Sequence, residues 1–108
     1  MRADLALMCK SHNYWMQGCI KNGQPSSFVK VGNWVISSTR QDKLIGGTVV
    51  LTEARSTPAY LGGRIIGFNP TPDGKCEVVF ESDLKVIGNR DAVGHRGWGS
   101  GRGVCYVV

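Results

Sequence analysis

The fold class follows from residues 62–81, which read GGRIIGFNPTPDGKCEVVFE. Two runs rich in β-branched and aromatic residues flank the segment 69–74, whose Asn, Pro, Asp and Gly residues are typical of a turn. Runs of this kind, bounded by turn residues, indicate strands. The sequence therefore predicts strands over Gly63 to Phe68 and over Cys76 to Ile87, joined as a β-hairpin.

The same rhythm recurs in the rest of the chain. Apolar runs bounded by turn residues predict further strands over 28–37, 47–54 and 104–108. Near the start, small and large apolar residues occupy every second position, which permits a first strand at Ala3, Leu5, Leu7 and Cys9. Five or six strands are expected in total.

Helical patterning is scarce in this chain. Only the segment 12–20 lacks the pattern of apolar runs bounded by turn residues. Within it, Trp15, Cys19 and Ile20 fall on one side at helical spacing. We therefore expect at most one short helix, placed over these residues.

A chain of 108 residues builds one hydrophobic core and leaves no room for a second domain. Five or six strands in so short a chain must hide their edges, and curling into a barrel achieves this with few residues. The predicted fold is mainly β, a single small, strongly bent β-barrel over residues 1–108.

Charge and composition limit the classes of partner. Thirteen Lys and Arg against 8 Asp and Glu give a net charge of +5, which permits an anionic partner such as RNA or DNA. The apolar stretch Leu5 to Met8 is too short for a signal-peptide core or a membrane span. We expect a cytoplasmic protein without a membrane partner.

The cysteines are expected to be reduced thiols in that compartment. A metal site is the alternative, because Cys9, His12 and Cys19 lie close together in the sequence. A structural zinc site requires a second ligand pair, whereas Cys76, His95 and Cys105 stand apart from one another. The sequence therefore predicts no metal and no cofactor.

No catalytic signature is present. Two histidines, His12 and His95, and eight scattered acidic residues do not form a nucleophile, base and acid set. The glycines at 97, 99, 101 and 103 alternate, so they lack the G-x-G-x-x-G spacing of a dinucleotide site. The expectation is a protein that is not an enzyme.

The most unusual segment is GNRDAVGHRGWGSGRG, residues 88–103. We interpret it as a flexible cationic loop in which Arg90, Arg96 and Arg102 grip phosphates and Trp98 stacks on a base. Cationic and aromatic side chains combine in this way on proteins that bind single-stranded nucleic acid. The same composition also suits a structural or protein-contact loop.

Two further tryptophans lie outside that loop. Trp15 and Trp34 fit core positions best, although an aromatic side chain at a barrel mouth also forms a pocket wall for a flat ligand. Ser37, Ser38 and Arg40 follow the strand that carries Trp34 and offer polar contacts to such a ligand.

The order of YWMQGCIKNG, FVKVGNWVIS and IGGTVVLTEA resembles the PUA-like superfamily, in particular its EVE-type domains. The matching pieces are Tyr14-Trp15, Gly18 to Asn22, Lys30 to Ser38 and Gly47 to Ala54. The resemblance implies a five- or six-stranded barrel that receives a nucleobase, often a modified one, without catalysis. By position, it implies a pocket formed by Trp15, Trp34, Ser37 and Ser38.

A rival resemblance is to the Src-homology-type small barrel, whose members bind peptides or nucleic acid or assemble into oligomers. The leading hypothesis is thus a module that binds nucleic acid or a nucleobase-like ligand. The alternative is a small domain that forms a homodimer through an edge strand such as VCYVV, residues 104–108, or holds a small molecule at a subunit interface.

Overall fold

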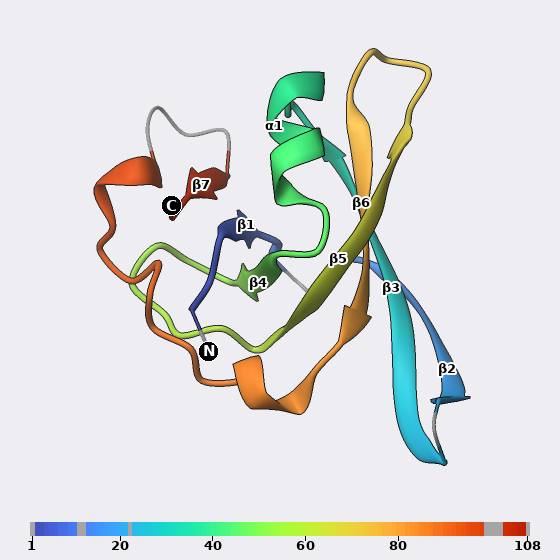
Figure 1. Cartoon of the computed structure of the whole chain (residues 1–108). Helices are drawn as coiled ribbons and strands as arrows, with labels where there is room; N and C mark the ends of the chain where they lie inside the picture. Colours follow the sequence, from blue (N-terminus) through green and yellow to red (C-terminus); the bar gives the residue numbers. More distant parts are fainter. Residues whose placement is uncertain (1, 11–12, 22, 99–102, 108) are drawn as a thin grey trace.

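A computed structural model describes residues 2–10, 13–21, 23–98 and 103–107. Seven strands form one mixed sheet in the order β2-β3-β6-β5-β4-β1-β7, accompanied by one short α-helix (Figure 1). The elements are β1 (Leu5–Met8), β2 (Trp15–Lys21), β3 (Gln24–Trp34), α1 (Ser38–Leu44), β4 (Thr48–Thr52), β5 (Leu61–Pro70), β6 (Cys76–Ser82), the 3-10 turns η2 (Leu84–Val86) and η3 (Arg96–Trp98), and β7 (Val104–Tyr106).

The predicted hairpin at residues 62–81 is confirmed. Strands β5 and β6 pair antiparallel, and their last pair before the turn joins Pro70 to Cys76. Within the turn, the Asp73 carboxylate accepts hydrogen bonds from the Thr71 hydroxyl and from the Lys75 backbone N–H, and Gly74 adopts a φ of 79°. These contacts, led by the Thr71 hydroxyl, lower the pKa of Asp73. The turn is therefore held by its own side chains.

Strand β1 lies inside the sheet, parallel to β4 and antiparallel to β7. Leu5, Leu7 and Leu51 face the main core, while Ala6 and Val50 belong to a second core on the other face. A strand covered on both faces has apolar residues at successive positions. This double burial explains why β1 (LALM) and residues 49–51 of β4 (VVL) are entirely apolar.

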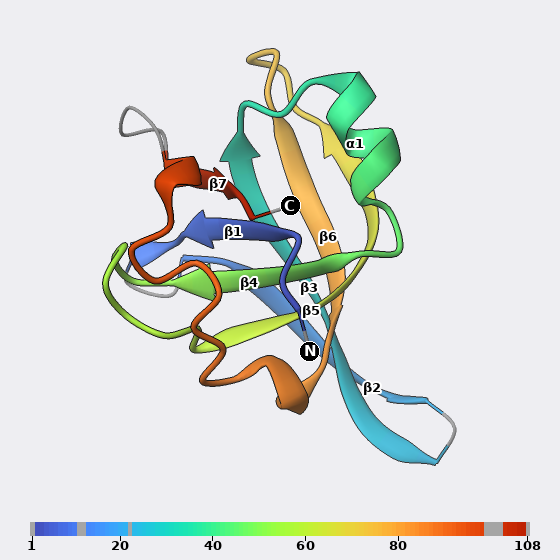
Figure 2. The same ribbon diagram turned by 60° about the vertical axis from the view of Figure 1, so that its left-hand side comes forward.

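The segment 83–98 covers the second face of β1 and β4 (Figure 2). Val86, Ala92 and Trp98 are buried in it, and the Trp98 indole donates a hydrogen bond to the Ala92 carbonyl at 2.6 Å. Trp98 is therefore buried, and it does not present the plate for base stacking that was expected of the segment 88–103. Residues 99–102, including Arg102, lie outside the described residues.

The sheet is not closed. Strands β2 and β7 stand at its two ends and do not pair with each other over the described residues. A mainly β fold with one short α-helix is confirmed, whereas a closed barrel is not, and the strand number exceeds the five or six expected.

The predicted helix over 12–20 is wrong. Residues 15–21 form β2, which pairs antiparallel with β3 and continues to the pair Lys21–Gln24. The hairpin of β2 and β3 extends beyond the rest of the molecule, so β2 has side chains exposed on both faces and lacks a clean alternation (Figures 1 and 2). The one α-helix lies instead at 38–44.

The first strand is confirmed as β1, and the predicted strand at 104–108 is present as β7. The other predicted strands have different ends: β3 starts at Gln24 and stops at Trp34, β4 covers Thr48–Thr52, β5 covers Leu61–Pro70, and β6 ends at Ser82 before η2. Within the described residues, the protein has no helix with the length and apolar character that crossing a membrane requires.

Candidate functional site

Helix α1 carries two of the predicted site residues, Ser38 and Arg40. The Ser37 hydroxyl caps the helix by accepting the Arg40 backbone N–H at 3.4 Å, and Leu44 is its buried residue. Gly46 follows with a φ of 85°, a conformation that suits glycine after a helix. Side chains three and four residues apart share one side of a helix, so Arg40, Lys43 and Leu44 project together.

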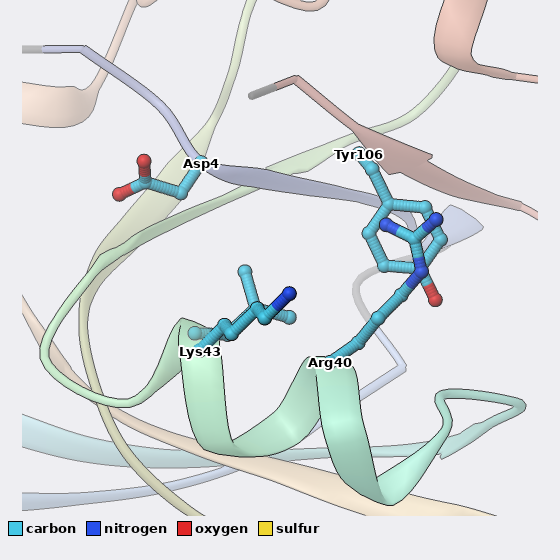
Figure 3. Close-up of a pocket in the computed structure, with 5 residues that line it drawn as sticks. Asp4, Arg40, Lys43 and Tyr106 are labelled. Atoms are coloured by element: carbon cyan, nitrogen blue, oxygen red, sulfur yellow. The ribbon is translucent and has the colours of Figure 1, made fainter.

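These three side chains line a pocket of about 180 Å³ between α1 and β7, here called the α1–β7 pocket (Figure 3). Tyr106 from β7 and Asp4, just before β1, complete its lining. The Arg40 guanidinium lies over the Tyr106 ring, with its carbon 3.9 Å from the ring centroid. This stacking occupies a face of the guanidinium, whose N–H donors point outward in its plane.

The charges of the α1–β7 pocket favour an anion. Its two cationic side chains, Arg40 and Lys43, are accompanied by one carboxylate, that of Asp4. That carboxylate accepts a hydrogen bond from the Thr48 backbone N–H at 2.8 Å. Burial raises the pKa of Tyr106, and Arg40 opposes the rise. The phenol is thus neutral near pH 7 and retains its hydrogen-bond donor.

A second concave region, here called the hairpin groove, has a volume of about 380 Å³. The Lys30 ammonium lies 4.8 Å from the centroid of the Trp15 ring, because the two residues are directly opposed in the β2–β3 ladder. Trp15 is 47% exposed. The groove is lined by Asn13, Tyr14, Trp15, Lys30, Gly32, Asn33 and Glu77.

A third, wide depression is lined by Arg2, Asp91, His95 and Val107. The His95 Nδ1 atom accepts the Gly97 N–H at 2.9 Å and lies 3.5 Å from the Cys105 sulfur. Burial raises the pKa of the Cys105 thiol, which keeps it protonated and a poor nucleophile. The contact is therefore that of a core thiol beside a turn histidine.

The predicted site residues are dispersed in the structure. Trp34 is buried in the main core, and its indole donates to the Val31 carbonyl at 3.1 Å. Ser37 and Ser38 are exposed at the start of α1, where Ser37 serves as the cap. The resemblance implies a pocket of Trp15, Trp34, Ser37 and Ser38, and the structure places these residues differently: Trp34 is buried, whereas the other three are exposed.

The predicted cationic loop is divided in the same way. Arg90 and Arg96 are exposed on the covering segment 83–98, whereas Trp98 is only 4% exposed. Trp98 therefore offers little ring surface to a base. Of the predicted residues, Arg40 and Trp15 line pockets of the described part of the chain.

Several pocket residues were missed in the sequence. Lys43 becomes visible once a helix is placed after Ser37, which the cap residue and Gly46 could have signalled. Lys30 follows from the hairpin register, and Asn22-Gly23 is the dipeptide most typical of a two-residue hairpin turn. No local sequence pattern identifies Tyr106 and Glu77 as pocket residues, because each reaches its pocket only through pairing between strands that are distant in the sequence.

The residues weighed as an alternative metal site lie on different parts of the chain. Cys9 is buried after β1, Cys19 lies partly buried on β2, and His12 is outside the described residues. All four cysteines are free thiols, and the described residues contain no group of three or more His, Cys, Asp or Glu arranged for a metal ion.

Comparison with protein-family models, with curated proteins and with solved structures gives no match for this chain. The resemblance to the PUA-like superfamily therefore stays a prediction. The functional argument rests on the α1–β7 pocket and the hairpin groove.

Proposed function

We propose that this chain is a non-enzymatic module that binds nucleic acid, with a phosphate-bearing nucleotide unit held at the α1–β7 pocket. The observation that carries the proposal is the pair of cations, Arg40 and Lys43, on one side of α1, with the Arg40 guanidinium over the Tyr106 ring. In this proposal, the bent sheet is a barrel-like scaffold of the PUA-like kind.

The size of the pocket supports a small planar or anionic group. Pockets for drug-sized ligands measure about 300–1,000 Å³, whereas this one measures about 180 Å³. Leu44 and Tyr106 supply apolar surface for a ring, and the guanidinium of Arg40 matches the paired oxygens of a phosphate. The net charge of +5 attracts a polyanion to the molecule as a whole.

The test measures fluorescence polarisation of labelled single-stranded RNA, single-stranded DNA and duplexes at about 50 mM and 200 mM salt. The double variant Arg40→Ala/Lys43→Ala should bind more weakly and with a smaller salt dependence. For a single strand, two lost phosphate contacts lower the slope of log affinity against log salt by about 1.4.

The matched control is Lys75→Ala/Lys85→Ala, which removes the same charge from two exposed residues in the β5–β6 turn and η2. Equal loss of affinity in both double variants would mean that net charge alone attracts the nucleic acid. Absence of binding at low salt would overturn the proposed function.

Self-association through a sheet edge is the second candidate, and the structure favours β2 for it. This end strand has seven residues and exposes Trp15, Met16 and Ile20, the last at 74%. The predicted edge β7 is also an end strand but has only three residues. A long apolar edge pairs readily with another strand. Sedimentation should show a dimer that Ile20→Lys dissociates, and a monomer at high concentration would exclude it.

A further inference from the structure

The hairpin groove joins an exposed aromatic ring, a cation and a carboxylate at the base of the β2–β3 hairpin. From this combination we infer that the groove holds one unpaired nucleobase, which stacks on Trp15 and donates an amino N–H to Glu77. The inference rests on the proposed function and deepens it, because it specifies single-stranded nucleic acid and a preference among bases.

Exposure singles out Trp15 as the stacking surface. The chain has three tryptophans, of which Trp34 is 9% and Trp98 is 4% exposed, against 47% for Trp15. Base stacking on aromatic rings is a general means of holding single strands, since every base presents a flat face. Paired bases are already stacked inside a duplex, so Trp15 favours an unpaired strand.

Lys30 lies over the Trp15 ring, and Tyr14, which also lines the groove, contacts the body of the protein. The Lys30 ammonium lies 4.8 Å from the Trp15 centroid, at a position where it can also meet the phosphate next to a stacked base. The Tyr14 ring is stacked on that of Tyr60, with centroids 6.3 Å apart. The aromatic side of the groove is therefore anchored to the body of the protein through Tyr60.

Glu77 decides which part of a nucleotide faces the groove. Its carboxylate repels a phosphate, so the base rather than the backbone must point toward it. One oxygen, Oε1, accepts a hydrogen bond from the Asn69 amide at 3.2 Å. A carboxylate accepts more than one hydrogen bond, and cytosine N4 is a donor that acidic side chains recognise. Bases with an exocyclic amino group should therefore bind better than thymine.

The experiment titrates the protein with single-stranded oligodeoxycytidine and oligothymidine of about 12 nucleotides each. Tryptophan fluorescence should be quenched on binding, because the most exposed indole is the one that stacks. Polarisation should show weaker binding of Trp15→Ala by about 5-fold to 150-fold. Met16→Ala is the matched control, since its side chain is 42% exposed on the opposite face of β2.

A second variant tests base selection. Oligodeoxycytidine should bind more tightly than oligothymidine, and Glu77→Ala should reduce that ratio toward one. Bound oligonucleotide without fluorescence quenching, equal affinities of Trp15→Ala and Met16→Ala, or no preference for cytosine in the unmodified protein would each overturn the inference. In any of these cases, loss of binding in Arg40→Ala/Lys43→Ala would still support the proposed function. The experiments therefore distinguish failure of this inference from failure of the proposed function.

Discussion

Single residues of one type have very different environments in this chain. Trp15 is exposed beside a lysine, Trp34 is buried against the main core, and Trp98 is buried over the second core. The residue type alone cannot distinguish these positions. The sequence suggested core positions for Trp15 and Trp34 and a surface position for Trp98, and only Trp34 follows that expectation. The exposure of each side chain depends on strand pairing and on the segment 83–98 that covers β1.

Thr52 at the end of β4 provides a prediction at this scale. Its side chain is buried, and its hydroxyl has no hydrogen-bond partner among the residues that the structure describes. A buried hydroxyl without a partner costs free energy that the similarly shaped valine avoids. Thr52→Val should raise the free energy of unfolding by about 1 kcal/mol, measured by urea denaturation.

The matched control is Thr57→Val. The Thr57 hydroxyl accepts the Ala54 N–H and donates to the Ala54 carbonyl, both at 3.0 Å. Its loss should lower stability by about 1 kcal/mol. Stabilisation by both variants would point to a general effect of valine and contradict the role of the orphaned Thr52 hydroxyl.

At the scale of elements, the sequence predicted best those strands that carry their own signals. The β5–β6 hairpin has apolar runs and a turn rich in Asn, Pro, Asp and Gly, and both its strands are present. The β2–β3 hairpin has side chains exposed on both faces of β2, which removes the alternation that marks a half-buried strand. Helix α1 is only seven residues long, too short for a clear helical period.

Two glycines of β5 allow a test of how closely the strands pack. A Cβ atom at Gly63 would lie 1.8 Å from the Glu81 carbonyl oxygen, whereas one at Gly67 would meet nothing within 4 Å. Gly63→Ala should therefore lower the free energy of unfolding by about 3 kcal/mol or more, because strand backbone must move. Gly67→Ala should change it by less than about 0.5 kcal/mol.

Thermal unfolding followed by circular dichroism separates these two variants. Equal stability of Gly63→Ala and Gly67→Ala would show that β5 and β6 are not in the contact described. An unfolded Gly63→Ala beside a folded Gly67→Ala is the expected pair of results.

Across the whole molecule, the first residues and the covering segment are tied together by Asp91. Its carboxylate accepts the Ala3 backbone N–H at 2.9 Å and the Asn89 amide at 3.2 Å. These hydrogen bonds, led by that of Ala3, lower the pKa of Asp91. A carboxyl group whose pKa is lower in the folded state stabilises the protein above its unfolded pKa of about 3.9.

That stabilisation should be lost as the pH falls from about 3.9 through the lowered pKa of the folded protein. We expect Asp91→Asn to lose less stability between neutral pH and pH 3 than the unmodified chain, with urea midpoints as the measurement. Asp73, whose pKa is also lowered, still contributes acid sensitivity in this variant. Identical acid dependence of the two proteins would show that the tether of Asp91 to Ala3 does not contribute.

Composition and strand rhythm predicted the class of the whole molecule, a mainly β domain with one short helix. They could not predict whether the sheet closes, because closure depends on how β2 and β7 lie relative to each other in space. The α1–β7 pocket was predictable only through Arg40, since Asp4 and Tyr106 are brought to it by pairings between distant parts of the chain.

The position of β1 between β4 and β7 also bears on the rate of folding. Leu5 pairs with Val49 on one side and with Tyr106 on the other, so each contact closes a long loop of chain. The entropy of loop closure is lost before such distant pairs form, and domains built on them fold in milliseconds to seconds rather than microseconds. Until β7 pairs with β1, the apolar side chains of Leu5, Ala6 and Leu7 are exposed to other chains. The protein is most prone to aggregate during this interval.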